Sequence, residues 1–418
     1  MNCTVKKHNL LKILFIIIVL MDIRLFYMYD FNGWYELILA IITFIFTIAF
    51  CPKRNGYPTK SLQILVFATF LSFTLVFVWS LLRYGNGFKT TLGGESANYK
   101  MLFILLAYPL TYICASKQGV RWLLNLLNKI TTIFYILIAL QFVVYNVNGT
   151  VFLNAISTGS NLQILYGSLR ISLSWLGELM LLYNFYMIYC KRETIPSKSK
   201  RFWYLFNFVL GFIDCLVVSR VRGSILPMCL CLVVIVLLQQ NTKQSIWRKL
   251  LLIAVICGVA FGTDIFSSFF ESFSESATRG YSTTARLYAI EYYWNIFLKN
   301  PLCGFGFADG IINYGIVHGD GRAAISDVGI FGVLAKYGIF TFAIYIIPLV
   351  RSFVLIRRMY KFKNIENQLL YLAFGLYIAA TSITLIAIGH YRMIQWVVYI
   401  SIIEYVYWVG KNKIRIIE

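Results

Sequence analysis

Two arginines stand two residues apart in the segment SRVRGS, residues 219–224, between two long apolar runs. A guanidinium group is planar and permanently charged, and its paired N–H donors match two oxygens of a phosphate or a carboxylate. An arginine in a membrane costs about 2.5–3.5 kcal/mol at the bilayer centre and less near the surface. Arg220 and Arg222 therefore indicate an anion-binding site, and contact with lipid headgroups is the alternative interpretation.

A further arginine lies in a long polar and aromatic segment, residues 267–326, which interrupts the apolar pattern. Arg286 belongs to the stretch STTARLYAIEYYWNIFLKNPLCGFGFADG within that segment. Its guanidinium group could clamp a phosphorylated substrate or could bind membrane phospholipid. Arg279 and Arg322 are weaker candidates for the same role, and they could simply keep the segment solvated.

Two residues at the end of this segment could accept a proton. Asp327 and His318 occur in HGDGRAAISDVG, and a carboxylate or an imidazole can act as the general base for a hydroxyl nucleophile. Asp327 could instead cap the helix that follows, and His318 could have no role in chemistry. The sequence offers no Cys/His cluster, DxD or HExxH motif. We therefore expect no metal and no cofactor.

A last group of charged residues falls inside or beside apolar runs. Arg170 and Glu178 are eight residues apart, which would put both side chains close to one face of a helix. Ionisable residues in membrane helices usually face the bundle interior, where this pair could line a polar cavity or touch a substrate. His390 and Arg392, in the stretch GHYRM, could reach the same cavity.

The elements that must position these groups are membrane helices. The 418 residues are 59% hydrophobic and 13% charged, whereas a soluble domain carries about 25% charged residues. This composition predicts one all-α, polytopic membrane domain that covers residues 1–418. A span needs roughly 20 apolar residues, and this length predicts about twelve spans. They are placed at residues 10–29, 34–50, 61–82, 100–116, 129–147, 168–189, 202–219, 223–239, 249–266, 327–350, 367–388 and 393–410.

The distribution of positive charge predicts the side of the membrane on which each loop lies. With a cytoplasmic N-terminus, the inner segments hold 16 Lys and 9 Arg, and the outer segments hold 4 Lys and 9 Arg. The positive-inside rule then predicts that both termini are cytoplasmic and that residues 267–326 form an outer loop between spans nine and ten. Because topology requires only positive charge, the share of arginine outside indicates anion binding there. The charge is too dispersed for nucleic-acid binding.

Within the outer loop, the pattern predicts an amphipathic helix rich in Tyr and Trp. Ser282 or Thr283 can cap its start, and Asn300-Pro301 ends it, which puts Arg286 in the first turn. Such a helix is suited to lying at the boundary between membrane and water. Apolar residues recur at helical spacing at Leu287, Ile290, Trp294, Phe297 and Leu298.

These pieces together resemble the O-antigen ligase/Wzy superfamily of bacterial enzymes, which polymerise or transfer polyprenyl-linked glycans. The stretch TTARLYAIEYYWNIFLKNPLCGFGF is similar to that family's R-x(n)-W…P-L-x-G-x-G signature. The short SRVRGS segment, the large outer loop and ISDVGIFGVLAKYGIF, at the start of the next span, also resemble family features. The resemblance covers the number of spans and about residues 219–340.

The resemblance implies a repeat-unit polymerase of the bacterial plasma membrane, with its active site on the outer face and no need for a nucleotide or a metal. A hydroxyl of one lipid-linked oligosaccharide would attack the anomeric carbon of another, and undecaprenyl diphosphate would leave. Arg220, Arg222 and Arg286 would hold the diphosphate. The implied partners are undecaprenyl-diphosphate-linked oligosaccharide, membrane lipid and a protein that regulates chain length.

Two alternatives remain open. Ligase-type members of the family commonly carry a His-Asn pair where this chain has Ser326-Asp327. The difference favours a polymerase over a ligase and leaves the base open between Asp327 and His318. A lipid-linked oligosaccharide flippase would also have about twelve spans and a cationic cavity, but flippases typically contain repeats and short loops on both faces. This sequence shows neither property.

Reporter fusions test the predicted topology. Alkaline phosphatase, which is active only outside the cytoplasm, should be active when it is fused within residues 303–321 and inactive when it is fused within residues 191–201. A fluorescent protein that folds only in the cytoplasm serves as the reciprocal reporter. Inactive phosphatase within residues 303–321 would contradict an outer anion site.

Overall fold

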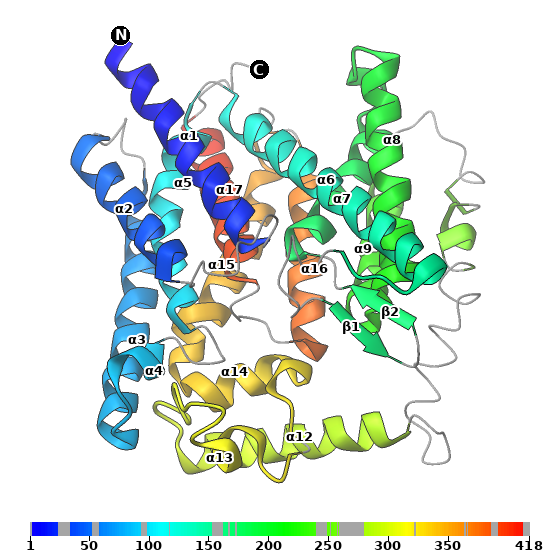
Figure 1. Cartoon of the computed structure of the whole chain (residues 1–418). Coiled ribbons are helices and arrows are strands. Elements are labelled where there is room, and N and C mark those ends of the chain that lie inside the picture. The colour runs from blue at the N-terminus through cyan, green and yellow to red at the C-terminus, as the bar shows by residue number, and fades with distance from the viewer. Residues whose placement is uncertain are drawn as a thin grey trace.

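The computed structural model is a bundle of helices, with α12, α13 and α14 lying across one end of it (Figure 1). The start of α1 and the end of α17 lie at the opposite end of the bundle (Figure 1). The structure describes residues 2–23, 34–51, 58–92, 98–116, 118–152, 162–165, 168–171, 174–239, 249–250, 252–256, 258, 280–321, 323–362, 365, 367–385 and 392–412.

The N-terminal part is held together by apolar packing and by a buried ion cluster. The amine of Lys100 lies 2.9 Å from Asp22 and 3.1 Å from Glu36, so η1 is tied to α1 and to the first turn of α2. A buried amine requires such partners, because burial of an unpaired charge is costly. The elements are α1 (Asn2–Asp22), α2 (Trp34–Phe50), α3 (Lys60–Tyr84), α4 (Phe88–Leu92), η1 (Asn98–Leu106), α5 (Ala107–Cys114) and α6 (Gly119–Asn148).

The C-terminal part contains the segments singled out in the sequence. Its first elements are β1 (Leu162–Leu165), β2 (Ser168–Ile171), α7 (Trp175–Cys190), η4 (Arg192–Thr194), α8 (Lys198–Ile213), the π-helix η5 (Asp214–Ser219) and α9 (Arg222–Leu238). The remaining elements are α12 (Gly280–Lys299), α13 (Tyr314–His318), η6 (Ile325–Asp327), α14 (Gly329–Tyr337), the π-helix η7 (Phe342–Ile346), α15 (Ile347–Met359), α16 (Gln368–Thr384) and α17 (Met393–Lys411).

Several helices are long and apolar enough to cross a membrane. Four of them in the described residues meet both criteria, namely Lys60–Tyr84, Gly119–Asn148, Lys198–Ser219 and Met393–Lys411. Shorter apolar helices lie at Tyr35–Phe50, Gly223–Leu238 and Gln368–Ile383. The predicted all-α membrane character is thus confirmed, and the described residues add one two-stranded β-hairpin to it. The number of twelve spans and the sidedness stay predictions, and most of the expected span 249–266 lies outside the described residues.

The expected span 168–189 is wrong at its start. Residues 168–171 pair with residues 162–165 in an antiparallel hairpin, in which Gln163 is opposite Arg170. Helix α7 begins only at Trp175, where the hydroxyl of Ser174 accepts a 3.2 Å hydrogen bond from the backbone of Gly177. Arg170 and Glu178 therefore do not share a helix.

The expected span 327–350 is also wrong, because the structure divides it into α14 and a second helical segment. Gly338 has a φ of +57°, and a Cβ there would lie 2.3 Å from the carbonyl oxygen of Leu302. The loop after α12 also packs on the backbone at the C-terminal end of α14. There the backbone N–H of Phe305 donates to the carbonyl of Ala335 at 2.7 Å. A Cβ on Gly304 would lie 2.0 Å from that same oxygen. These contacts stop α14 after 9 residues, which is too short to span a bilayer.

The predicted amphipathic helix exists as α12, and its predicted end before Asn300 is confirmed. Its start is wrong, because the helix begins at Gly280 and so contains Ser282 and Thr283 instead of being capped by them. Arg286 consequently lies in the second turn. One face of α12 buries Ala289 and Tyr293 against α14 and the loops. The other face exposes its large apolar side chains, namely Leu287, Trp294 and Leu298.

Helices α12, α13, η6 and α14, with the loops between them, form what we call the cap unit, residues 280–337. It has a hydrophobic cluster of its own and is seated on the end of α3. There the hydroxyl of Tyr84 donates to the carbonyl of Phe305 at 2.7 Å, and Arg83 donates to the side chain of Asn300 at 3.0 Å. The buried Lys336 amine also donates to Asn98 of η1 at 2.7 Å. Because α3 is long enough to span a membrane, we expect the cap unit to lie at the membrane surface.

Lys336 should make the stability of the protein depend on pH. Burial lowers the pKa of this amine from 10.5 to about 7, so between these values the unfolded chain binds a proton that the folded chain does not. Stability should therefore fall as the pH drops from about 10 to about 7, and this contribution should not change further below that range. Lys336→Met should remove the slope and raise stability at neutral pH by a few kcal/mol, measured by chemical unfolding in detergent.

Lys299, which is exposed at the end of α12, provides the matched control. Lys299→Met should leave the pH dependence as it is in the unsubstituted protein, because an exposed amine keeps its water in both states. Equal slopes for Lys336→Met and the unsubstituted protein would contradict the burial of an amine that loses its proton near neutral pH.

Candidate active site

The SRVRGS segment forms a strained turn between two helices. Helix α8 continues as the π-helix η5, which ends at Ser219, and Arg220 follows with a φ of +52°. Its backbone N–H bonds the carbonyl of Cys215 at 3.1 Å, and its exposed Nε bonds the carbonyl of Val217 at 2.7 Å. A left-handed conformation usually belongs to glycine, and other residues keep it at a cost of about 1–2 kcal/mol. Strain of this kind and π-bulges are both frequent at functional sites.

Arg170 connects the β-hairpin to this turn. Its Nε donates to the carbonyl of Ser219, the residue before Arg220, at 2.8 Å. The side chain is half-buried, and burial lowers the pKa of its guanidinium group, while the carboxylate of Asp327 opposes that shift. Arg170 thus lies in electrostatic range of the predicted base.

Asp327 ends η6 and accepts a 3.2 Å hydrogen bond from the hydroxyl of Ser326. The interpretation of Asp327 as the cap of the next helix is wrong, because Val328 occupies the N-cap of α14 and no side chain caps it. Gly329 fixes the place of this segment, with a φ of +52° and a Cβ position only 2.3 Å from the carbonyl oxygen of Ser382. The start of α14 is therefore held directly against the backbone of α16.

The turn after η5 reaches the same end of α16. A Cβ on Gly223 would lie 3.0 Å from the side chain of Leu385, which directly follows α16. The C-terminal end of α16 thus brings together the start of α14 and the start of α9, which are far apart in the sequence. We call the group formed by Arg170, Ser219, Arg220 and Asp327 the junction site. It combines an exposed guanidinium group with a carboxylate and a half-buried arginine, which suits an anionic ligand and a proton transfer.

Other predicted site residues are not joined to the junction site by any described contact. Arg286 is exposed on α12, and His318 stacks its ring on Tyr314 with centroids 4.8 Å apart at the end of α13. Tyr293 of α12 is joined to α13, because its hydroxyl donates to the carbonyl of Val317 at 2.6 Å. Burial raises the pKa of Tyr293, with smaller contributions from Tyr292 and Asp327. A site shared by Arg286 and Arg220 stays a prediction.

Four predicted positions cannot be compared with the structure. Arg222 begins α9, but its side chain lies outside what the structure describes. Arg279, Arg322 and His390 also lie outside the described residues.

Glu178 and Arg392 lie in a buried polar cluster beside the junction site. The hydroxyl of Tyr377 donates to the carboxylate of Glu178, and the Nη1 of Arg392 donates to Thr381 at 3.1 Å. The sequence analysis missed both Tyr377 and Thr381. Their spacing of four residues puts them on one face of α16, and two polar side chains at that spacing in an apolar run could have identified them.

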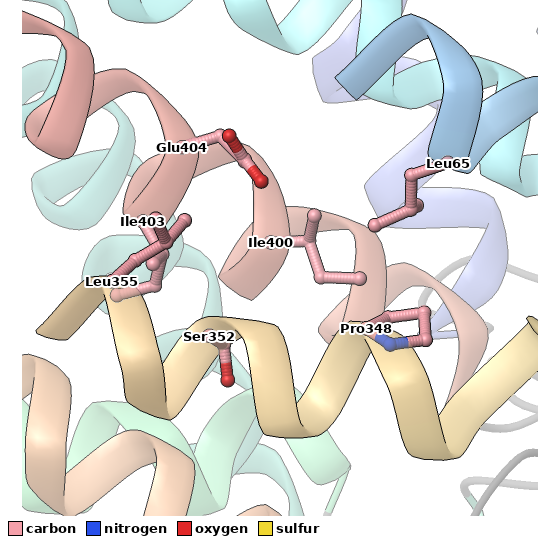
Figure 2. Close-up of a pocket in the computed structure, with 7 residues that line it drawn as sticks. All are labelled: Leu65, Pro348, Ser352, Leu355, Ile400, Ile403 and Glu404. Atoms are coloured by element: carbon pink, nitrogen blue, oxygen red, sulfur yellow. The ribbon is translucent and has the colours of Figure 1, made fainter. Parts of the chain in front are cut away.

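The described residues contain no group of three or more His, Cys, Asp or Glu side chains that could hold a metal ion. They do contain a small pocket between α3, α15 and α17, lined by Leu65, Ser352 and Glu404 among others (Figure 2). Glu404 lies twelve residues beyond Arg392, about 18 Å along a helix. This pocket therefore lies beside the middle of α17, away from Arg392 at the start of that helix.

The two arginines of the junction site should differ in their contribution to stability. Arg170→Met removes the donor to the carbonyl of Ser219 at a half-buried position and should lower the free energy of unfolding by about 1–3 kcal/mol. Arg220→Met removes an exposed side chain that bonds Val217 in its own turn, so the change should be about 0.5 kcal/mol or less. Denaturant unfolding of both variants checks this, and equal losses would contradict the distinction.

The segment that carries most of the junction site matches a known family. A family model described as O-antigen ligase (Wzy_C) matches residues 206–346, from within α8 to the end of η7. That segment includes Arg220, the whole cap unit and Asp327. No curated protein matches the chain. Members of the matched family are glycosyltransferase-like enzymes, either polymerases or ligases. Residues 206–346 of this membrane protein are therefore similar to the O-antigen ligase (Wzy_C) family.

Proposed function

We propose that this protein is an oligosaccharide repeat-unit polymerase at the outer face of the bacterial plasma membrane. It transfers a glycan from undecaprenyl diphosphate to a hydroxyl of another lipid-linked repeat unit, in the synthesis of O-antigen, capsule or exopolysaccharide. The observation that carries the proposal is the exposed Arg220 in its left-handed turn, beside Arg170 and Asp327, in a segment that matches the O-antigen ligase family.

The proposed reaction forms a bond from the acceptor oxygen to the anomeric carbon of the donor and breaks the bond from that carbon to the diphosphate oxygen. The leaving diphosphate keeps the electron pair of the broken bond, so its negative charge rises in the transition state. Guanidinium groups of Arg220, Arg222 and Arg286 would stabilise this charge. Because the sugar–diphosphate bond already stores the energy of the transfer, the proposed reaction uses no nucleotide and no metal.

The acceptor hydroxyl loses a proton in the same reaction. Asp327 is our proposed base, and its place at the junction site beside Arg170 supports this role over the alternative, His318. Arg170 would place its positive charge beside this carboxylate. The hydrogen bond from Arg170 to Ser219 would at the same time hold the Arg220 turn next to the base.

A second candidate is a ligase that transfers a finished glycan to another acceptor, because the matched family model carries that description. The Ser326-Asp327 sequence, where ligase-type members commonly have a His-Asn pair, favours the polymerase. Both candidates use the same donor and the same leaving group. They differ only in the acceptor, and the products made in cells distinguish them.

Substitution of the proposed diphosphate ligands tests the function. Arg220→Ala and Arg286→Ala should each lower polymerisation about 100-fold or more, because each removes a charge from the leaving group's binding site. Arg286→Lys should also be strongly impaired, since lysine lacks the two-pronged donor. The measurement is the profile of lipid-linked glycans in cells, where we expect single repeat units at the outer leaflet. Arg357→Ala, which changes an exposed arginine of α15, should leave the profile unchanged.

The same profile identifies the competing functions. Long glycans that remain on the lipid carrier in the Arg220 and Arg286 variants would indicate a ligase. Repeat units that no longer appear outside the cell would indicate a flippase. Full activity of Arg286→Lys would show that simple charge attraction is sufficient at that position.

A further inference from the structure

Arg392 is buried at the start of α17, close to the junction site. The residue is only 3% exposed, and its guanidinium carbon lies 3.4 Å from the centre of the Trp175 ring. The Nη1 atom donates to Thr381, the residue next to the one whose carbonyl contacts Gly329. Arg392 therefore bonds to α16 one residue before Ser382, whose carbonyl lies against Gly329.

The described residues leave one edge of this guanidinium group without a hydrogen-bond partner. Among the described residues, neither Nε nor Nη2 of Arg392 has a hydrogen-bond acceptor. These two atoms form the side of the fork that binds two oxygens of one anion at once. An arginine buried to this degree normally satisfies its donors, because an unpaired buried donor costs about 1–3 kcal/mol.

Arg351 shows how the same edge looks when it is filled. Its Nε lies 2.5 Å from one carboxylate oxygen of Glu404, and its Nη2 lies 3.0 Å from the other. Both arginines belong to the same bundle, and α17 contacts both of them. In Arg351 the carboxylate is part of the chain, whereas in Arg392 the corresponding place is unfilled by any described residue.

The nearest acidic side chain does not take this place. Glu178 attracts Arg392 electrostatically, but no described ion pair or hydrogen bond joins them. The carboxylate of Glu178 accepts the hydroxyl of Tyr377 instead. The Trp175 ring contacts the guanidinium group through a cation–π interaction and supplies no acceptor to Nε or Nη2.

We propose that the free Nε–Nη2 edge of Arg392 is a binding subsite for an oxyanion of the substrate that presents two oxygens. The inference rests on the proposed function and adds a subsite to it. Two groups in a lipid-linked acidic glycan have this chemistry, namely the diphosphate of the carrier and the carboxylate of an acidic sugar. Because the site is buried, a bound anion would exchange its water for two charge-assisted hydrogen bonds in one plane.

Binding of undecaprenyl diphosphate to the full-length protein in lipid nanodiscs tests the proposal. Arg392→Lys keeps the charge but lacks the two-pronged edge, so it should weaken binding about tenfold or more. Arg351→Lys is the matched control, because it changes the same edge of an arginine already paired with Glu404. It should bind undecaprenyl diphosphate with unchanged affinity. The affinity for glucuronate, measured in parallel on the same proteins, tests whether the subsite binds the carboxylate of an acidic sugar.

Each result has one reading. Weaker binding of undecaprenyl diphosphate by Arg392→Lys supports the subsite and assigns it to the diphosphate. Weaker binding of glucuronate alone supports the subsite and assigns it to a sugar carboxylate. Unchanged affinity for both ligands overturns the subsite, and the proposed function survives if Arg220→Lys weakens the binding of undecaprenyl diphosphate. An unsubstituted protein that does not bind undecaprenyl diphosphate overturns the proposed function and this inference together.

A second measurement avoids substitution and covers the case in which Arg392→Lys does not fold. An experimental structure of the unsubstituted protein with undecaprenyl diphosphate or glucuronate should place two oxygens of one anion within hydrogen-bond distance of Nε and Nη2. Ordered water at both atoms, with the ligand bound elsewhere, would overturn the proposal.

Discussion

The junction site depends on close backbone contact at the C-terminal end of α16. Gly329 lies against the carbonyls of Ser382 and Ile383, and Gly223 lies against Leu385. A Cβ at Gly329 would come within 2.5 Å of both carbonyl oxygens, so a larger residue would push the start of α14 away from α16. These two contacts bring η6 to the turn after η5, although about one hundred residues separate them in the chain. The chemistry that we propose therefore requires a packing contact that involves no charged residue.

The charged side chains of this apolar protein fall into two groups, those with complete hydrogen-bond or ion-pair partners and those without. Lys100 is buried between Asp22 and Glu36, and Arg351 donates from Nε and Nη2 to Glu404, so these groups hold helices together. A buried charge with complete partners is stable but has no capacity left for a ligand. Arg220 is exposed, and Arg392 keeps one edge of its fork unfilled by the described residues. Guanidinium donors that the described residues leave unpaired, and not charge alone, therefore distinguish the arginines available to a substrate from those that stabilise the fold.

The sequence was sufficient for features that local chemistry determines. Apolar composition predicted the all-α membrane character. Asn300-Pro301 predicted the end of α12, because proline lacks a backbone donor and disfavours the helical conformation of the residue before it. It failed where distant segments decide the outcome. Residues 168–171 became a strand because residues 162–165 pair with them, and the break after α14 depends on the contact of Gly338 with Leu302. Arg170 was predicted as a site residue, but on the wrong element and with the wrong neighbour. No spacing rule joins it to Ser219 or Asp327.

The position of the arginines agrees with the physical demands of a lipid-linked leaving group. The hydrocarbon tail of such a substrate stays in the bilayer, so its diphosphate lies at the membrane surface. Cations that meet it belong at the ends of the spans, where their own burial costs least. Arg83 lies at the end of α3, Arg220 follows the π-helix that ends the α8 span, and Arg286 lies on the cap unit. A turn is also better suited than a helix interior to this purpose, because a residue outside the helical ladder can present its side chain without breaking backbone hydrogen bonds. Arg220, held in the left-handed region between η5 and α9, meets both conditions.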